Sequence, residues 1–554
     1  MGVFDYKRRE TNEVKIGNTA VGGENPIRIQ SMTDTSTNDI DGSVKQIIEI
    51  TDAGADIVRL TAQGIREVES LKEIHRKLRE KGYDIPLVAD IHFNPSAAFA
   101  AASVVEKVRI NPGNFADPGR VFKKIEYTEE DYQKELKNLK DKVLPFFELC
   151  KKEGTTVRIG VNHGSLSDRI MSRYGNTPAG MVESAMEFLR IANDADFKDI
   201  VISIKSSSTA VMVETVRRLV KALEREGMYF PIHLGVTEAG AGEDGRIKSA
   251  IGIGTLLAEG IGDTIRVSLS EHPAREIPVA KELVRYIESK KDAGPIEGSF
   301  SSGYDYFSPK RRKTFKVGKL GNGGIPLEYS EVNPDDFVKA DTEDRLEKII
   351  SLLKDNPNKA LLLTSSHRNP VGAVRAIIHA MTDNKLENPV VVSLDYSADK
   401  NKDDVILHAA ADFGALLLDN IIDGIRIVSP LFTDKELYEL ALSIMQGSGK
   451  RISHTEFIAC PGCGRTLFDL APTLEQVRKA TNHLSGLKIG VMGCIVNGPG
   501  EMAGADYGYV GAAKGRISLY RGMECVEKNI PQEMAVEKLI NLIKKDGKWE
   551  EPKE

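Results

Sequence analysis

Eight short apolar segments in the first 270 residues are each followed by a stretch with helical apolar spacing. In the first such stretch, for example, Val44, Ile47 and Ile48 share one helix face. Eight β-then-α units within about 250 residues predict a (β/α)8 (TIM) barrel, with a doubly wound open sheet as the alternative. The predicted strands are Ile27–Thr33, Ala55–Thr61, Ile85–Phe93, Lys107–Asn114, Thr155–Gly164, Asp199–Ser207, Pro231–Gly240 and Asp263–Ser270.

The chain of 554 residues is too long for one hydrophobic core, because cores stop growing at about 250–300 residues. A Gly/Ser-rich and then basic segment, 294–313, is typical of a linker. Alternation of β and α resumes after it, with apolar runs at 360–364, 389–394, 415–418 and 424–428. We therefore expect an α/β protein of three domains: the barrel (1–292), an inserted α/β domain (293–448) and a C-terminal α+β domain (449–554).

The C-terminal domain closes with an amphipathic helix through Val536, Leu539, Ile540 and Ile543. A net charge of -6 argues against nucleic acid as a partner, since phosphate-backbone binders usually carry a basic excess. Apolar runs stay short of the ~18–20 residues that span a bilayer, and the first ten residues lack the apolar core of a signal peptide. We expect a cytoplasmic protein with neither a nucleic-acid nor a membrane partner.

Basic side chains gather at the ends of the predicted barrel strands, where the active site of a TIM barrel lies. Like charges in a partly desolvated pocket repel strongly, so the group requires a neutralising anion. Arginine binds phosphate oxygens with a planar fork, which favours a di- or polyphosphate ligand; pairing with carboxylates such as Asp90 and Glu238 is the alternative. The predicted anion-binding cations are Arg59, Arg109, Arg158, Lys205 and Arg266.

Glu238 follows a predicted strand beside this cationic group. A carboxyl group in that position is a candidate for proton transfer to a leaving hydroxyl. Orienting one of the arginines is its alternative role. The nearest other candidates for carrying a proton are His92, His163 and His233.

Three of the five cysteines, Cys460, Cys463 and Cys494, lie within 35 residues of one another. The first two form a Cys-x-x-Cys turn, and the third lies in a Gly-rich loop. Zinc sites usually take four protein ligands, whereas an iron-sulfur cluster can use three thiolates with a different fourth ligand. Because no histidine lies near Cys494, the spacing favours iron-sulfur over zinc without excluding zinc.

The sequence resembles the (E)-4-hydroxy-3-methylbut-2-enyl diphosphate synthase family, of the methylerythritol phosphate route to isoprenoids. The resemblance covers almost the whole chain outside the inserted domain, whose presence is similar to the long, plant-type form of the family. It implies one [4Fe-4S] cluster per chain, held by Cys460, Cys463 and Cys494 with Glu501 as an exchangeable fourth ligand. The matching motifs are IRIQSMT, ADIVRLT, VRINPGN, RIGVNHGSL, SIKSS, GVTEAG, IRVSLS, CPGCGRT and MGCIVNGPGE.

The resemblance also implies the reaction: reductive ring opening and dehydroxylation of 2-C-methyl-D-erythritol 2,4-cyclodiphosphate to (E)-4-hydroxy-3-methylbut-2-enyl diphosphate. Two electrons come singly from reduced ferredoxin or flavodoxin, and Glu238 protonates the departing oxygen. The implied neutral donors to the substrate are Asn111, Asn162, His163, Ser206, Ser207 and Ser268.

In the short form of the family the cluster domain of one subunit caps the barrel of another. The inserted domain predicts instead that the C-terminal domain folds back onto its own barrel, in a monomer or a dimer. Two alternatives remain: a dihydropteroate-synthase-like barrel enzyme with a structural zinc domain, and a zinc-stabilised module that captures an anionic metabolite.

Overall fold

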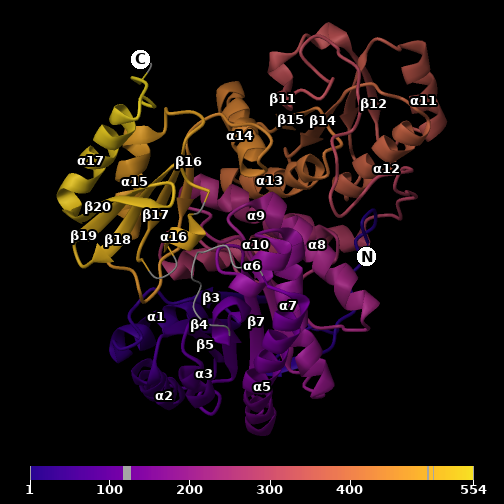
Figure 1. The fold of residues 1–554 in the computed structure, drawn as a ribbon. Coiled ribbons are helices and arrows are strands. Elements are labelled where there is room, and N and C mark those ends of the chain that lie inside the picture. Colours follow the sequence, from indigo (N-terminus) through magenta and orange to yellow (C-terminus); the bar gives the residue numbers. More distant parts are fainter. Residues whose placement is uncertain (1, 117–126, 496–497, 503, 553–554) are drawn as a thin grey trace.

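The computed structural model describes residues 2–116, 127–495, 498–502 and 504–552. Eight parallel strands close a barrel in the order β10-β3-β4-β5-β6-β7-β8-β9 (Figure 1). The barrel confirms the predicted fold, and the open-sheet alternative is wrong. The strands are β3 (Arg28–Met32), β4 (Ile57–Ala62), β5 (Leu87–Ile91), β6 (Lys107–Ile110), β7 (Thr156–Asn162), β8 (Ile200–Lys205), β9 (Ile232–Leu234) and β10 (Thr264–Ile265).

Helices cover the outside of the barrel because each buries one apolar stripe against the strands. In α8, for example, Met212, Val216 and Leu219 are fully buried, and the side chain of Ser208 caps the first turn. The helices of this domain are α1 (Ile40–Asp52), α2 (Ile65–Glu80), α3 (Pro95–Ala101), α4 (Pro112–Phe115), α5 (Glu129–Glu153), α6 (Asp168–Tyr174), α7 (Pro178–Asp194), α8 (Thr209–Arg225), α9 (Gly242–Ala258) and α10 (Glu276–Glu288).

A hairpin of β1 (Val14–Ile16) and β2 (Thr19–Val21) closes the amino end of the barrel. Val14, Ile16 and Val21 form one buried apolar cluster with residues near the starts of three barrel strands. Since this end is sealed by apolar packing, the polar carboxyl end is the face left for chemistry.

The inserted domain is a five-stranded parallel sheet in the order β11-β15-β14-β13-β12. The strand expected at 415–418 is wrong, because those residues end the long helix α13, which packs against α9 of the barrel. The elements are β11 (Leu327–Glu328), β12 (Phe337–Asp341), α11 (Leu346–Asp355), β13 (Ala360–Thr364), α12 (Pro370–Asp383), β14 (Val390–Asp395), α13 (Lys402–Leu418), β15 (Gly424–Val428) and α14 (Asp434–Gly447).

Buried ion pairs join the inserted domain to the barrel. Arg217 of the barrel lies 2.9 Å from Asp419, and Arg375 of the inserted domain lies 2.9 Å from Glu259. All four side chains are buried. Tyr306, from the predicted linker, donates a hydrogen bond to Glu259. The linker is therefore packed into this interface.

The C-terminal domain is a mixed five-stranded sheet in the order β16-β17-β18-β19-β20, covered by two longer helices (Figure 1). The predicted amphipathic helix is present, and it buries Ala535, Leu539 and Ile543. In the described part of the chain, no helix is long and apolar enough to cross a membrane. The elements are β16 (Glu456–Ala459), α15 (Leu470–Thr481), β17 (Lys488–Met492), α16 (Gly498–Glu501), β18 (Tyr507–Ala513), β19 (Arg516–Arg521), β20 (Glu524–Pro531) and α17 (Gln532–Lys545).

Candidate active site

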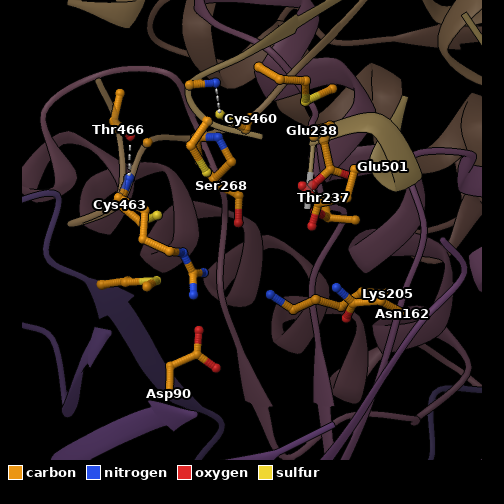
Figure 2. Close-up of a pocket in the computed structure, with 18 of the residues that line it drawn as sticks. Asp90, Asn162, Lys205, Thr237, Glu238, Ser268, Cys460, Cys463, Thr466 and Glu501 are labelled. Carbon is orange, nitrogen blue, oxygen red and sulfur yellow. Dashed lines mark hydrogen bonds between the residues drawn. The ribbon is translucent and has the colours of Figure 1, made fainter. Parts of the chain in front are cut away.

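One cavity lies between the carboxyl end of the barrel and the loops that follow β16 and β17 (Figure 2). Both walls belong to the same chain, so the C-terminal domain covers its own barrel. The predicted residues that line this cavity are Arg59, Arg109, Asn162, Lys205, Glu238, Arg266, Ser268, Cys460, Cys463, Cys494 and Glu501.

A second cavity adjoins the first and shares Lys205, Glu238 and Glu501 with it. Its wall contains His163, Ser206 and Ser207. These three predicted donors therefore lie beside the first cavity, on the side of the loop that leads into α8.

Two predicted substrate-binding residues line neither cavity. The side chain of Asn111 caps α4 by accepting a hydrogen bond from the Gly113 amide (3.1 Å). Arg158 is fully buried in the barrel interior. It precedes Asn162 by four residues on β7, and side chains alternate along a strand, so Arg158 lies two inward-facing positions deeper. Among the described residues, none of its guanidinium nitrogens has a hydrogen-bond partner.

The cations of the cavity have few acidic partners. Arg109 donates to Asp90 (3.0 Å), and Arg59 donates to the sulfur of Met32 (2.8 Å) and lies 4.0 Å from Asp90. These two arginines hold the pKa of Asp90 well below its usual range despite its burial. Burial and the neighbouring arginines lower the pKa of Lys205 well below its usual range. The excess positive charge is what an anionic ligand would neutralise.

Arg266 is paired with a carboxylate that the sequence analysis missed. Glu276, at the start of α10, accepts from its Nε and Nη2 at 3.2 and 3.0 Å. Glu276 also accepts from the Ser31 hydroxyl and the Leu269 amide, at 2.8 and 3.1 Å. The four bonds fix the Arg266 fork at one orientation in the cavity wall.

Glu238 and Glu501 lie against each other (Figure 2). Burial and the nearby Glu501 raise the pKa of Glu238 well above its usual range, and burial likewise raises the pKa of Glu501. The Thr237 hydroxyl donates to Glu238, whose backbone is in the left-handed region (φ 52°). This conformation is uncommon for a non-glycine residue, and it turns the carboxyl group toward the C-terminal domain.

The cysteines reach the cavity through strand pairing. Strands β16 and β17 are parallel neighbours, with Ala459 opposite Val491, so the loops that carry Cys460 and Cys494 leave the sheet at the same edge. The Gly493 amide donates to the sulfur of Cys460 (3.2 Å). Cys463 lies in a tight turn in which its amide donates to the Thr466 hydroxyl (3.0 Å).

The chemistry of this donor set fits an iron-sulfur cluster. Three thiols and the carboxyl group of Glu501 face a single cavity, and the Gly493 amide points toward the sulfur of Cys460. No three His, Cys, Asp or Glu side chains of the described residues gather as they would around a single metal ion. A cluster of several irons holds its thiolates farther apart than one ion does, so a cavity is the space it requires.

His92, predicted as an alternative proton carrier, also lines the cavity, as does Arg465, which was not among the predicted site residues. Burial and Arg109 lower the pKa of His92 to about 3, so its ring is neutral at pH 7. Arg465 directly follows the Cys-Pro-Gly-Cys-Gly motif, and a cation beside thiolates was the available signal. The nearby Cys463, Asp90, Cys494 and Glu501 raise the pKa of Arg465 despite its burial, so its guanidinium can balance negative charge at the cysteines.

The chain matches two family profiles: "GcpE TIM-barrel domain" over residues 11–281 and "GcpE protein C-terminal domain" over residues 456–545. A Bacteroides fragilis protein named "4-hydroxy-3-methylbut-2-en-1-yl diphosphate synthase (flavodoxin)" is 50% identical, across 100% of this chain and 98% of that one. The chain belongs to the 4-hydroxy-3-methylbut-2-en-1-yl diphosphate synthase family. A relative of the same name in Phocaeicola vulgatus is 49% identical, with 100% of both chains covered.

Membership of this family confirms the predicted resemblance and does not favour the dihydropteroate-synthase-like alternative. A solved dihydropteroate synthase from Stenotrophomonas maltophilia is 11% identical, with a TM-score of 0.35 over 51% of this chain and 100% of that one. The full-length match to the family includes the inserted domain, which neither family profile covers.

Proposed function

We propose that this chain opens the ring of 2-C-methyl-D-erythritol 2,4-cyclodiphosphate and removes a hydroxyl group, producing (E)-4-hydroxy-3-methylbut-2-enyl diphosphate. Reduced flavodoxin, which is part of the names of the relatives, is the proposed electron donor, with ferredoxin as the alternative. One observation carries the proposal: phosphate-binding cations and three cysteines line the same cavity of one chain.

The barrel wall holds the diphosphate in this proposal. Arg59, Arg109, Lys205 and Arg266 supply positive charge, which the nearby acids only partly balance. Asn162 and Ser268 add neutral donors, with His163, Ser206 and Ser207 from the adjoining cavity. Arg158 and Asn111 would contact the substrate only if the diphosphate or their side chains moved.

We further propose one [4Fe-4S] cluster per chain, with Cys460, Cys463 and Cys494 as ligands and Glu501 as the exchangeable fourth. When bound, this group supplies two electrons singly and a Lewis-acidic iron. In this proposal the Gly493 amide and the Arg465 guanidinium stabilise negative charge on the cysteine sulfurs.

Glu238 is the proposed proton donor. The overall reaction takes up two electrons and one proton: the C–O bond to the ring phosphate breaks to leave a diphosphate anion, and the hydroxyl leaves as water. Glu238 projects into the cavity next to Glu501, within reach of a group held between the two walls. The C-terminal domain covers the mouth of the barrel and keeps bulk water from reactive species.

The proposed division of the chain follows the three sheets: barrel 1–292, inserted domain 293–448, C-terminal domain 449–554. Each chain completes its own active site, whether the protein is a monomer or a dimer. The inserted domain then acts as a rigid spacer, since buried ion pairs bind it to the barrel.

Anaerobic purification followed by iron, sulfide and zinc analysis tests the proposal first. We expect about four irons and four sulfides per chain, an absorbance band that bleaches on reduction, and loss of both in Cys460→Ser. Turnover of the cyclic diphosphate with reduced flavodoxin is the second assay. Stoichiometric zinc, or a loaded protein that leaves the cyclic diphosphate unchanged, would contradict the proposal.

A further inference from the structure

Backbone contacts at glycines join the barrel to the C-terminal domain on opposite sides of the cavity. Gly164, in the loop after β7, lies against Gly500 of α16. Gly464, directly after Cys463, lies against Thr35, in the loop after β3, and Thr61, near the end of β4. Strands β3 and β7 are four positions apart in the ring of eight, so the two contacts face each other across the barrel mouth.

Neither contact leaves room for a side chain. A Cβ atom at Gly500 would lie 2.8 Å from the carbonyl oxygen of Gly164, and one at Gly164 would lie 2.7 Å from the carbonyl carbon of Gly500. A Cβ atom at Gly464 would lie 2.6 Å from the Thr35 carbonyl oxygen and 2.8 Å from the Thr61 hydroxyl. Cβ atoms essentially never approach other heavy atoms closer than 3.0 Å, so in each case one domain would have to move away from the other.

Backbone conformation does not explain these glycines. Gly462 has φ 78°, which favours glycine in the Cys-x-x-Cys turn, whereas Gly164, Gly464 and Gly500 lie outside the left-handed region. An alanine could adopt their φ angles. What excludes a side chain at these three positions is the approach of the other domain.

We propose that the two glycine contacts set how closely the C-terminal domain approaches the barrel, and that Gly164 and Gly464 are positioning residues for the reaction. This inference rests on the proposed function, because its consequence is the distance between the phosphate-binding wall and the cysteines. Gly500 precedes Glu501, and Gly464 follows Cys463. Each contact therefore sets the distance between one proposed cluster ligand and the carboxyl ends of the barrel strands.

Other bonds across the interface depend on the same approach. The Ser270 hydroxyl donates to the Cys460 carbonyl (2.8 Å), and the Ala459 amide donates to the Glu238 carbonyl (3.4 Å). Both lie beside β9 and β10, which stand between the two glycine contacts in the ring of strands. A displacement at Gly164 would therefore tilt the C-terminal domain and lengthen these bonds.

The test uses the full-length, cluster-loaded protein with Gly164→Ala, and Gly504→Ala as the matched control. A Cβ atom at Gly504 meets no described atom within 4 Å. We expect Gly164→Ala to keep normal iron content and to bind the cyclic diphosphate, in the absence of reductant, within about threefold of wild type, because the binding cations belong to the barrel. We expect kcat to fall about a hundredfold, because misplacement by about 1 Å has that effect.

Hydrogen exchange supplies a readout independent of turnover. The amide of Ala459, which donates across the interface, should exchange about tenfold faster in Gly164→Ala than in wild type or Gly504→Ala. Unchanged exchange and kcat would overturn the inference, as would a loss of substrate affinity as large as the loss of kcat. A wild-type protein without turnover would instead contradict the proposed function and leave the exchange comparison standing.

Gly500→Ala creates the same clash from the other domain and serves as the second variant. If Gly164→Ala fails to fold or to bind iron, exchange and iron content in Gly500→Ala decide the matter. Failure of both variants to fold would also overturn the inference, since a contact that only sets the approach of two folded domains leaves each of them intact.

Discussion

The carboxyl groups of Glu238 in the barrel and Glu501 in the C-terminal domain lie side by side across the covered mouth of the barrel, and the pKa values of both are raised. This contact joins a residue at the carboxyl end of a barrel strand to one in a Gly-Pro-Gly-Glu turn more than 260 residues away. It links the proposed proton donor directly to the wall that carries the cysteines.

Replacing Glu238 with glutamine tests its role as proton donor without changing the size of the side chain. The amide side chain would keep the size and hydrogen-bonding capacity of the carboxyl group but could not release a proton in the same way. We expect kcat for Glu238→Gln to fall by about 10²–10⁴, with iron content unchanged and KM within a few-fold of wild type. Steady-state kinetics with reduced flavodoxin measure both constants; a kcat within tenfold of wild type would assign the proton to another group.

Glu276 is expected to act through Arg266. In Glu276→Gln, the fork of Arg266 loses one charged acceptor and its fixed orientation. We expect KM for the cyclic diphosphate to rise about tenfold, as a charge-assisted pair contributes roughly 1.5–3 kcal/mol, while kcat changes less. Glu288→Gln, at the other end of α10, is the control. Equal effects of the two substitutions would exclude a specific role for the pair.

Closure within one chain predicts the result of mixing two inactive variants. Cys460→Ser lacks a proposed cluster ligand, and Glu238→Ala lacks the proposed proton donor. Because both residues line the cavity of one chain, a mixture of the two proteins should stay inactive. Activity is assayed after co-incubation and after co-expression. Recovery toward a quarter or more of the wild-type rate would mean that one subunit caps the barrel of another.

Substitution of Arg158 tests two separate properties, the thermal stability of the barrel and the binding of the diphosphate. It is a buried cation whose guanidinium nitrogens lack hydrogen-bond partners among the described residues, and replacing buried charges with apolar side chains of similar volume often stabilises proteins by about 1–4 kcal/mol. We expect Arg158→Met to melt at a higher temperature than wild type without substrate. If Arg158 also contacts the diphosphate, KM rises in the same variant; an unchanged KM would remove it from the binding site.

His379 makes the interface between the barrel and the inserted domain sensitive to acid. Burial lowers its pKa to about 4, with nearby Arg375 lowering it further and Asp419 opposing the shift. The neutral ring is therefore favoured in the folded protein: its contribution is complete above pH about 6.5 and is lost as the pH falls toward 4. At pH 5 the loss reaches about 2 kcal/mol.

Urea unfolding at pH 7 and pH 5 measures this effect. In His379→Gln, which does not titrate, the difference in unfolding free energy between the two pH values should shrink by about that amount. His92 and His233 remain in both proteins and contribute equally to both curves. An unchanged difference would show that His379 keeps an ordinary pKa.

The barrel could be predicted because its strands are short, β-branched runs at regular spacing, each followed by a helix with one apolar face. The prediction of a strand at 415–418 was wrong because the helix that contains these residues does not have a single apolar face. Helix α13 is buried nearly all round, between its own sheet and α9, so its sequence lacks the alternation of apolar and polar residues that marks a surface helix.

Site residues that belong to a short sequence motif could be predicted. Residues whose role depends on how deep they lie in the barrel, or on a helix distant in the sequence, could not. Cys460, Cys463 and Cys494 carry their own motif. Glu276 lies at the start of a helix rather than at a strand end, so strand-end counting did not include it. Arg158 was predicted to bind the anion at the strand ends, but the depth of a side chain in a barrel depends on the stagger of neighbouring strands, which one sequence does not show.

The buried quartet of Arg217, Glu259, Arg375 and Asp419 limits how this enzyme could be shortened. Deleting 293–448 to mimic the two-domain form would remove Arg375 and Asp419. Their partners Arg217 and Glu259 would then be exposed on a surface of the barrel that is covered in this protein. A minimal version would need a redesigned outer face on α8 and α9 as well as a new connection. The inserted domain therefore contributes to the stability of the barrel. Its loss would destabilise the barrel as well as shorten the connection to the C-terminal domain.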